Sequence, residues 1–202
     1  MAIRLKGRSG YPIDDPFCPT FHKGRLNEPL SVKDGVMIFT CSMGDIFDPN
    51  IEIAWRKKVY ETIKKTPQHT YQILTKQCVV EPGNEGFRDN IWLGVSIDGS
   101  SEYWKAPLSA LKNSSAKVKF ISFEPLIGEK ITLDFDGIDW IIIGAQTGNG
   151  AKPPKMSTVM KIIKKAKCQG IPVFIKPNIR KYFNGSSGDL KNLEEFPKGA
   201  LS

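Results

Sequence analysis

The sequence lacks any long hydrophobic run. Its longest apolar stretch, Ile141–Ala145, is far shorter than the roughly 18 residues that a membrane-spanning helix needs. The segment Met1–Gly10 contains no apolar core of the kind that a signal peptide carries. These two absences argue against a membrane protein and against a secreted one, so we expect a cytoplasmic protein with no membrane partner.

Cysteine is scarce and has no metal-ligand spacing. There are four cysteines, and no two of them form a Cys-x-x-Cys pair. Neither His22 nor His69 lies at ligand spacing from a cysteine. The cysteines are Cys18, Cys41, Cys78 and Cys168. In a reducing compartment four free thiols are expected rather than two disulfides, and spacing assigns no zinc or iron–sulfur site.

Acidic residues are outnumbered by basic ones. Lysine and arginine total 29 against 21 acids, which gives a net charge of +8 and a pI near 9.3. Such a balance makes a phosphate-bearing partner such as nucleic acid physically reasonable. However, the lysine pairs at 57–58, 64–65 and 164–165 lie among apolar residues at helical spacing, which also fits ordinary solvated helix faces. Charge alone leaves both interpretations open.

What the sequence has in abundance is short, β-branched apolar runs. The chain has 202 residues, of which 40% are hydrophobic, as is usual for one globular domain. Several runs are continuously apolar, which is typical of parallel strands buried on both faces. The predicted strands are Val36–Cys41, Thr70–Leu74, Ile91–Ser96, Val118–Phe123, Trp140–Ala145 and Pro172–Lys176.

Helical signals lie between these runs. Asp48 as a cap and Pro49 in the first turn predict a helix from about Pro49 to Lys65. A second helix is predicted from Ser157 to the stop at Gly170, and a shorter one over Tyr103–Leu111. The glycine-rich segment 81–90 fits either a short helix or a loop.

Six strands alternating with helices predict an α/β fold of right-handed βαβ units. A parallel (β/α) barrel is preferred to an open doubly wound sheet because no glycine-rich phosphate-binding fingerprint follows any strand. We expect one domain over 1–202, with an irregular segment at 1–35, βα units at 36–181 and an irregular tail at 182–202. Six strands instead of eight predict a partial, TIM-like barrel that lacks its first strand, with an open edge available for self-association.

Polar side chains follow most of the predicted strands. In a parallel barrel the carboxyl ends of the strands meet at one mouth, so these side chains should converge there. Lys76 and Lys176 with Glu124 are the catalytic candidates, as an acid–base pair. Ser42, Asp45, Ser96 and Gln146 are the candidates for ligand binding, and Thr75, Asp98, Ser122 and Thr147 occupy similar positions.

Each candidate also has a purely structural interpretation. Asp45 could cap the turn before Asp48, the lysines could be exposed strand ends, and Gln146 could belong to a plain turn. A hydrogen-bonded structural role is favoured for both histidines. Cys41 lies inside a predicted strand and is interpreted as a small buried side chain.

Seven segments, taken in order, resemble a known family. They are FCPTFHKGRLNEP (17–29), IFTCSMGDIFD (38–48), PQHTYQILTK (67–76), NIWLGVSI (90–97), FISFEPLIG (120–128), GIDWIIIGAQTG (137–148) and VFIK (173–176). Together they are similar to the phage-encoded family named after gene products thirty-seven and sixty-eight. Members of that family resemble radical S-adenosylmethionine (SAM) enzymes.

The resemblance implies a (β/α) barrel with a [4Fe–4S] cluster held by three cysteines in a stretch near the amino terminus. That stretch is absent here, since the opening MAIRLKGR resembles what normally follows it, and Gln146 stands where the family usually has glutamate. The expectation is a phage or prophage radical-SAM-like protein, truncated or without its cluster, that is unable to do radical chemistry alone.

Several residue roles follow from the same resemblance. Ser42 and Asp45 would lie where such enzymes hold the methionyl amino group of SAM, a cofactor that this chain could still bind. Ser96, Glu124 and Gln146 would face the ribose, the carboxylate and the substrate, and Lys76 a phosphate or carboxylate. Two other function classes remain open, namely a basic nucleic-acid-binding module and a cluster-independent barrel enzyme that uses Lys76 or Lys176 with Glu124.

Overall fold

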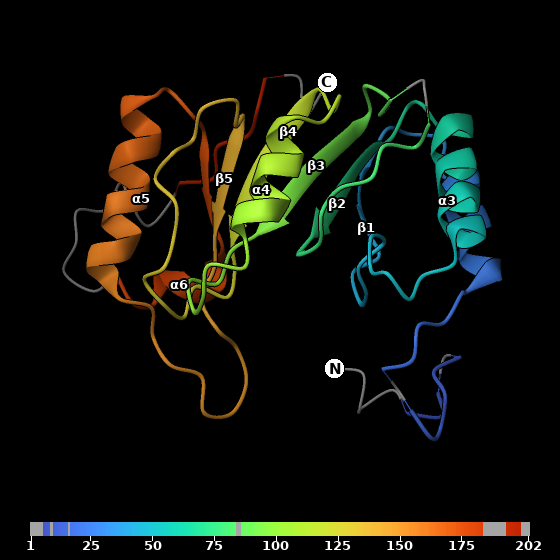
Figure 1. Cartoon of the computed structure of the whole chain (residues 1–202), viewed down its shortest axis with the longest axis horizontal. Coiled ribbons are helices and arrows are strands. Elements are labelled where there is room, and N and C mark those ends of the chain that lie inside the picture. Colours follow the sequence, from blue (N-terminus) through green and yellow to red (C-terminus); the bar gives the residue numbers. More distant parts are fainter. Residues whose placement is uncertain (1–5, 9, 16, 84–85, 184–192, 199–202) are drawn as a thin grey trace.

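Six parallel strands lie side by side in the order in which they occur along the chain (Figure 1). The computed structural model describes residues 6–8, 10–15, 17–83, 86–183 and 193–198. The strands are β1 (Met37–Thr40), β2 (Thr70–Thr75), β3 (Ile91–Ser96), β4 (Val118–Phe123), β5 (Trp140–Ile143) and β6 (Val173–Ile175). The sheet curls into an open half-barrel, so the predicted α/β fold with a partial parallel barrel is confirmed.

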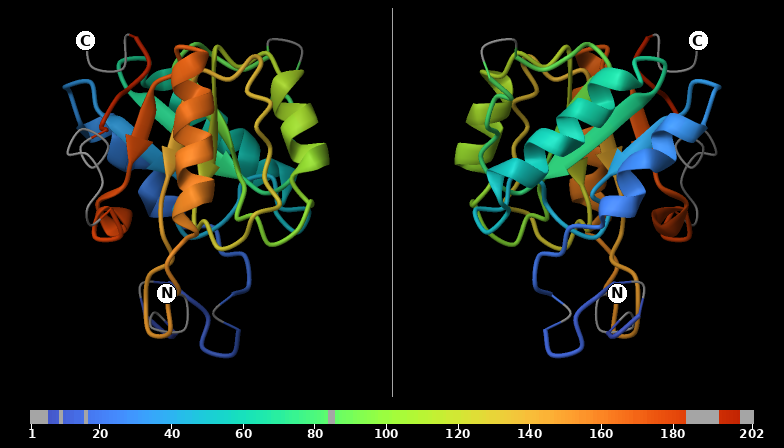
Figure 2. Two further views of the ribbon diagram at one scale, coloured as in Figure 1. Left: turned by 90° about the vertical axis from the view of Figure 1, so that its left-hand side faces the viewer. Right: turned by 90° about the vertical axis from the view of Figure 1, so that its right-hand side faces the viewer.

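Three longer helices cover the convex side of the sheet (Figures 1 and 2). They are α3 (Ile53–Lys65), α4 (Lys105–Lys112) and α5 (Met156–Cys168), and the short elements are η1 (Lys23–Asn27), α2 (Glu28–Ser31) and α6 (Pro177–Arg180). Strand residues such as Leu93 and Ile121 are fully buried with helix residues such as Leu111 and Ile162 in one hydrophobic cluster. Burial of this layer is the main force that holds the helices on the sheet.

A second, aromatic cluster fills part of the concave side. It contains Trp92, Phe120, Trp140 and Ile142, with Phe174 and Phe196 packed against it. A Cβ at Gly94 would lie 2.3 Å from the Phe120 ring, so only glycine leaves room for this ring between β3 and β4. This part of the interior of the half-barrel is therefore packed with aromatic side chains.

The sequence placed most elements to within a few residues, with one clear error at a helix start. Helix α3 begins at Ile53 and not at Pro49, because Asp48 accepts a hydrogen bond from the backbone N–H of Asn50 (2.8 Å) and closes a turn before the helix. In 81–83 and 86–90 there is no helix. Most of the expected irregular tail lies outside the described residues, but Glu194 forms an antiparallel bridge to Phe174.

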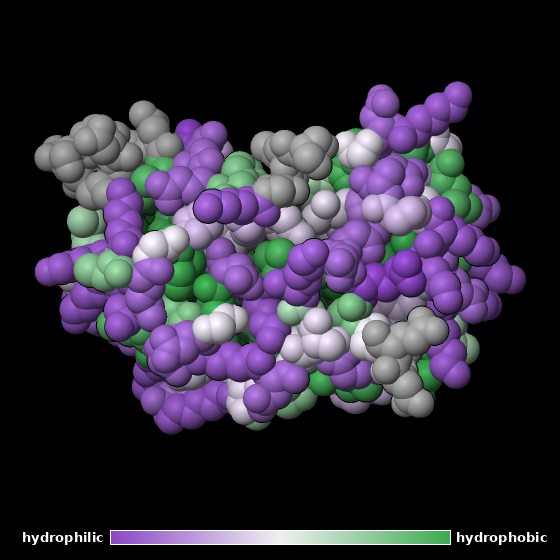
Figure 3. Space-filling view, turned by 90° about the horizontal axis from the view of Figure 1, so that it is seen from above, coloured by the Kyte–Doolittle hydropathy of each residue, from purple (hydrophilic) through white to green (hydrophobic). Residues whose placement is uncertain are grey.

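The end at which the strands begin shows a mostly hydrophilic surface with small hydrophobic areas between (Figure 3). Within the described ranges, no helix has the length and apolar character needed to cross a membrane. The carboxyl ends of the strands, with their polar residues, lie at the opposite end of the sheet.

Candidate functional site

Strand alternation places four charged side chains on the concave face, just beyond the strand ends. Leu74 pairs with Gly94, Ser96 with Ser122, and Ile142 with Phe174. Side chains two residues further along a strand point to the same face. Lys76, Asp98, Glu124 and Lys176 therefore follow strand residues that face the inside of the half-barrel. We call these four residues the charged rim.

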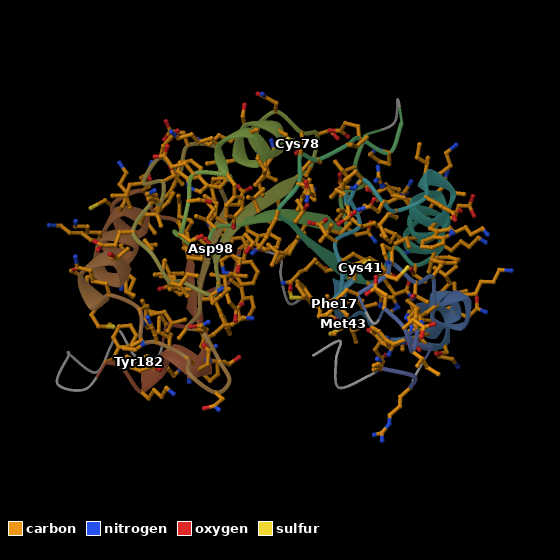
Figure 4. The ribbon with its side chains drawn as sticks, turned by 60° about the horizontal axis from the view of Figure 1, so that its bottom comes forward. Phe17, Cys41, Met43, Cys78, Asp98 and Tyr182 are labelled. Carbon is orange, nitrogen blue, oxygen red and sulfur yellow. The ribbon has the colours of Figure 1, made fainter. Side chains whose placement is uncertain are left out.

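One half of the charged rim is the pair Lys76–Asp98. Lys76 Nζ lies 3.7 Å from Asp98 Oδ2 and 5.6 Å from the centre of the Tyr103 ring. Tyr103 donates a hydrogen bond to the backbone oxygen of Ser96 (3.1 Å), which fixes its ring under the ammonium group. The Asp98 side chain is 13% exposed, and Figure 4 shows it between Cys41 and Met43 on one side and Tyr182 on the other.

The pKa of Asp98 lies below its ordinary value. Burial acts to raise this pKa, but it is outweighed by hydrogen bonds from the Ser100 hydroxyl and backbone N–H and by the Lys76 ammonium group. Burial and the nearby Asp98 charge together raise the pKa of Tyr103. Asp98 is thus a carboxylate, and Tyr103 a neutral phenol, over the physiological pH range.

The other half of the charged rim is the pair Lys176–Glu124. Lys176 Nζ lies 2.5 Å from Glu124 Oε2, and the two side chains are 41% and 23% exposed. A Cβ on Gly144 would lie 2.8 Å from Glu124 Oε1, so glycine at this position makes room for the carboxylate. The sequence indicated a glycine-rich turn here but not its purpose.

Two polar residues hold the strand ends behind the charged rim. Ser96 donates from its hydroxyl to the backbone oxygen of Glu124 (3.1 Å), which ties β3 to β4. Asn178 donates from Nδ2 to the backbone oxygen of Ala145 (2.8 Å) and accepts from the Ala145 N–H (3.2 Å). Sequence reasoning missed both Asn178 and Tyr103, because Asn178 bonds to Ala145 and Tyr103 lies against Lys76, and both partners are far away in the chain.

Asp45 does not join the charged rim. Its carboxylate accepts hydrogen bonds from the Thr75 hydroxyl (2.8 Å), the Lys76 N–H (2.8 Å) and the Phe47 N–H (3.0 Å). Thr75 alternates with Lys76 along the chain and so faces the helix side of the sheet. Asp45 therefore anchors the loop after β1 to the end of β2, and the ligand-binding role given to it stays a prediction.

Ser42 and Gln146 occupy loops at the strand ends. Ser42 is exposed in the turn that the Gly44 N–H closes onto the Cys41 carbonyl. Gln146 accepts a hydrogen bond from the Lys152 N–H through Oε1 (3.2 Å) and so closes the loop 146–152. The ligand-binding roles given to these two residues stay predictions.

His69 has the structural role that its sequence context favoured. It is 1% exposed, accepts a hydrogen bond from the Val36 N–H at Nδ1 and lies 2.9 Å from the Pro29 oxygen at Nε2. The interpretation of Cys41 as a buried strand residue is wrong, because Cys41 follows β1 in a turn with a positive φ of 55° and is exposed. Partial desolvation of its thiol and the Asp45 charge raise its pKa to about 11. A thiol with such a pKa is a weak nucleophile at neutral pH.

The residues present do not fit an iron–sulfur cluster. Such a cluster needs three thiolates together, whereas Cys18, Cys41, Cys78 and Cys168 belong to four separate segments and each is a free thiol. Across the described ranges there is no group of three or more His, Cys, Asp or Glu side chains that could hold a metal ion. We therefore derive no electron-transfer step for these residues.

Comparison with known proteins gives one match. A family described as "Protein of unknown function (DUF5131)" matches residues 3–183, which covers most of the chain. No curated protein and no solved structure matches.

Proposed function

This chain belongs to the DUF5131 family, and we propose that its half-barrel binds a small zwitterion of the SAM type at the charged rim. The observation that carries the proposal is the presence of two opposite-charge pairs on one concave face: Lys76–Asp98 beyond the neighbouring strands β2 and β3, and Lys176–Glu124 beyond β6 and β4, with β5 between them. The resemblance to phage-encoded, radical-SAM-like proteins is its second support.

The chemistry of the ligand matches these groups. The methionyl end of SAM carries an ammonium group, which needs a carboxylate acceptor, and a carboxylate, which needs cationic donors. The charged rim offers both kinds of group from different strands. A zwitterion can exchange partners with the two pairs without leaving any charge unpaired.

Each pair has one accessible member. Both lysines are about half exposed, at 51% and 41%, whereas Asp98 and Glu124 are 13% and 23% exposed. A ligand that supplies both charges gives each of these carboxylates a new cationic partner when the lysine moves to the ligand carboxylate. Asp45, Tyr103 and Asn178 hold the strand ends in place by hydrogen bonds to the backbone and would position the rim for binding.

The test is calorimetric titration with three related ligands. SAM and S-adenosylhomocysteine both carry the zwitterion and are expected to bind, whereas 5′-methylthioadenosine lacks it and should bind at least about tenfold more weakly, or 1.4 kcal/mol. The variants Asp98→Asn and Glu124→Gln should weaken SAM binding. Glu61→Gln, which removes an exposed carboxylate from α3, is the matched control.

Two results would overturn the proposal. One is that SAM and 5′-methylthioadenosine bind equally well, because the amino acid end would then contribute nothing. The other is that the rim variants bind SAM as the wild type and Glu61→Gln do, which includes the case in which none of them binds it.

A further inference from the structure

Helix α5 presents four lysines and no acid to solvent. The sequence MSTVMKIIKKAKC buries Val159, Ile162, Ile163 and Ala166 against the sheet. Lys161, Lys164, Lys165 and Lys167 are all exposed on the other side of the helix. Residues three and four apart share a helix face, so these ammonium groups form one continuous surface. Figure 2 (left) shows this helix along the flank of the half-barrel that faces the viewer.

The acidic residues near α5 do not neutralise the positive charge of its four lysines. Glu129 and Asp134 lie close enough to Lys161 and Lys165 to be affected by them, but each has a nearer lysine partner. Glu129 pairs with Lys155 (2.8 Å) and Asp134 with Lys112 (2.7 Å). Asp136 accepts a hydrogen bond from Gln169 instead. Among the described residues, none forms an ion pair with any of the four α5 lysines.

A groove of about 630 Å³ opens at the amino-terminal end of this helix. Its walls are the loops after β3, β4 and β5, with Ile127 and Pro153 as apolar groups, Lys130 as a cation and the Lys155–Glu129 ion pair. Ile127 is 48% exposed, although it is a large apolar side chain. Gly99 and Gly128 pack so closely that a Cβ on either would lie within 2.4 Å of the other's carbonyl oxygen, which brings two of these loops together.

The groove lies next to the start of α5. Among its lining residues, Lys155 directly precedes the helix, and Gly99 follows Asp98 in the chain. A ligand that lies along α5 can therefore extend into the groove. A groove with apolar groups next to a row of ammonium groups suits a flat base attached to a phosphate backbone.

Helix α3, on the opposite flank, is the internal comparison. It carries five basic residues, one more than α5, but also Glu61. Arg56 donates to the backbone oxygen of Ile46 and lies over the Phe47 ring, and Lys58 lies over the Phe21 ring. Two basic residues of α3 thus take part in the packing of the protein, whereas no such contact is seen for the four α5 lysines among the described residues.

We propose that the outer face of α5 and the adjoining groove bind a single-stranded nucleic acid. The lysines contact successive phosphates, and one unpaired base enters the groove against Ile127 and Pro153. The inference does not rest on ligand binding at the charged rim, and the variants that test it leave the rim residues unchanged.

The experiment measures binding of a fluorescently labelled single-stranded oligothymidine by anisotropy over a series of salt concentrations. The double variant Lys164→Gln/Lys167→Gln is compared with Lys57→Gln/Lys65→Gln on α3, because both lower the net charge by the same two units. The α5 variant should bind several-fold more weakly at low salt and should reduce the slope of log K against log salt by about 1.4, or 0.7 per lost contact. The α3 variant should stay close to wild type.

Equal losses in the two double variants would overturn the proposal, because binding would then depend on net charge alone. The same holds if the wild type does not bind the oligonucleotide. The groove is tested separately with Ile127→Ser, which keeps the net charge and should weaken binding while the slope of log K against log salt stays nearly unchanged. If a blunt-ended duplex of the same length binds as tightly as the single strand, the proposal that an unpaired base enters the groove is wrong. An oligouridine competitor shows whether the surface distinguishes RNA from DNA.

Discussion

The two edges of the half-barrel are finished differently. Beside β6, the segment 193–196 runs antiparallel to the strand, with hydrogen bonds from the Ile175 N–H to the Leu193 oxygen (2.8 Å) and from the Glu195 N–H to the Val173 oxygen (3.1 Å). Beside β1, no described residue pairs with the outer edge. Val36 and Phe39 are 40% and 48% exposed at this edge.

The covered edge also continues the aromatic cluster. Trp140 donates from Nε1 to the Glu195 oxygen (2.8 Å), and the Phe196 ring lies 5.4 Å from Trp140 and 5.3 Å from Phe174. On the β1 side the stabilising contact is instead polar, since His69 links β1 to the segment before it. One edge is therefore stabilised by apolar burial and the other by a few hydrogen bonds. This difference predicts unequal responses to mutation.

The largest difference should appear between Trp140→Ala and Phe39→Ala. Trp140 is 2% exposed at the centre of the aromatic cluster, so its loss should lower the free energy of unfolding by about 4 kcal/mol. Phe39 is half exposed, and its loss should change the same quantity by less than about 0.5 kcal/mol. Urea denaturation of both variants measures the two values. Similar losses would mean that the edges do not differ in burial.

His69→Ala should have the next largest effect and lower the free energy of unfolding by about 2 kcal/mol. The substitution leaves the Val36 N–H and the Pro29 carbonyl without their partner. Hydrogen–deuterium exchange should show faster exchange in β1 than in β6. Lys57→Ala, at an exposed position of α3, is the control. Uniformly faster exchange in both strands would show that His69 does not act on the β1 edge in particular.

A smaller effect is expected at the charged rim between the edges. The pKa of Asp98 is lowered in the folded protein, so ionisation of this group adds stability at neutral pH, and this stability is lost as the pH falls through the folded pKa. Asp98→Asn should be less stable than wild type at pH 7 and should lose less stability between about pH 5 and pH 2. Thermal unfolding across this range checks the sign; parallel curves for the two proteins would contradict it.

The smallest effect on stability, but a clear one on association, is expected for Phe39→Lys. An uncovered strand edge with exposed apolar side chains favours pairing with another chain, and a lysine there opposes it. Sedimentation velocity should show less concentration-dependent association than in the wild type. Phe196→Ala, which loosens the cover of β6, should change association in the opposite direction. A wild type that stays monomeric at all concentrations would show that the β1 edge does not associate.

The strands and the polar ends of the strands could be predicted from sequence. Runs such as Ile91–Ser96 and Val118–Phe123 match β3 and β4 residue for residue, because buried parallel strands are continuously apolar. Lys76, Glu124 and Lys176 were found by position alone, since the period of two in a strand fixes which side chains share a face. Both signals are local and therefore survive in a single sequence.

Contacts between segments that lie far apart in the chain are determined by the tertiary structure alone. The Asp45 carboxylate accepts a hydrogen bond from the Thr75 hydroxyl because the loop after β1 turns to the helix side of the sheet. The partners of Lys76 and Lys176, the role of His69 and the cover of β6 by residue 194 depend on sheet register and on how strongly the sheet curls. Composition and periodicity determine which residues of a strand are buried. Which side chain from another segment contacts each of them is determined only by the packing of the whole chain.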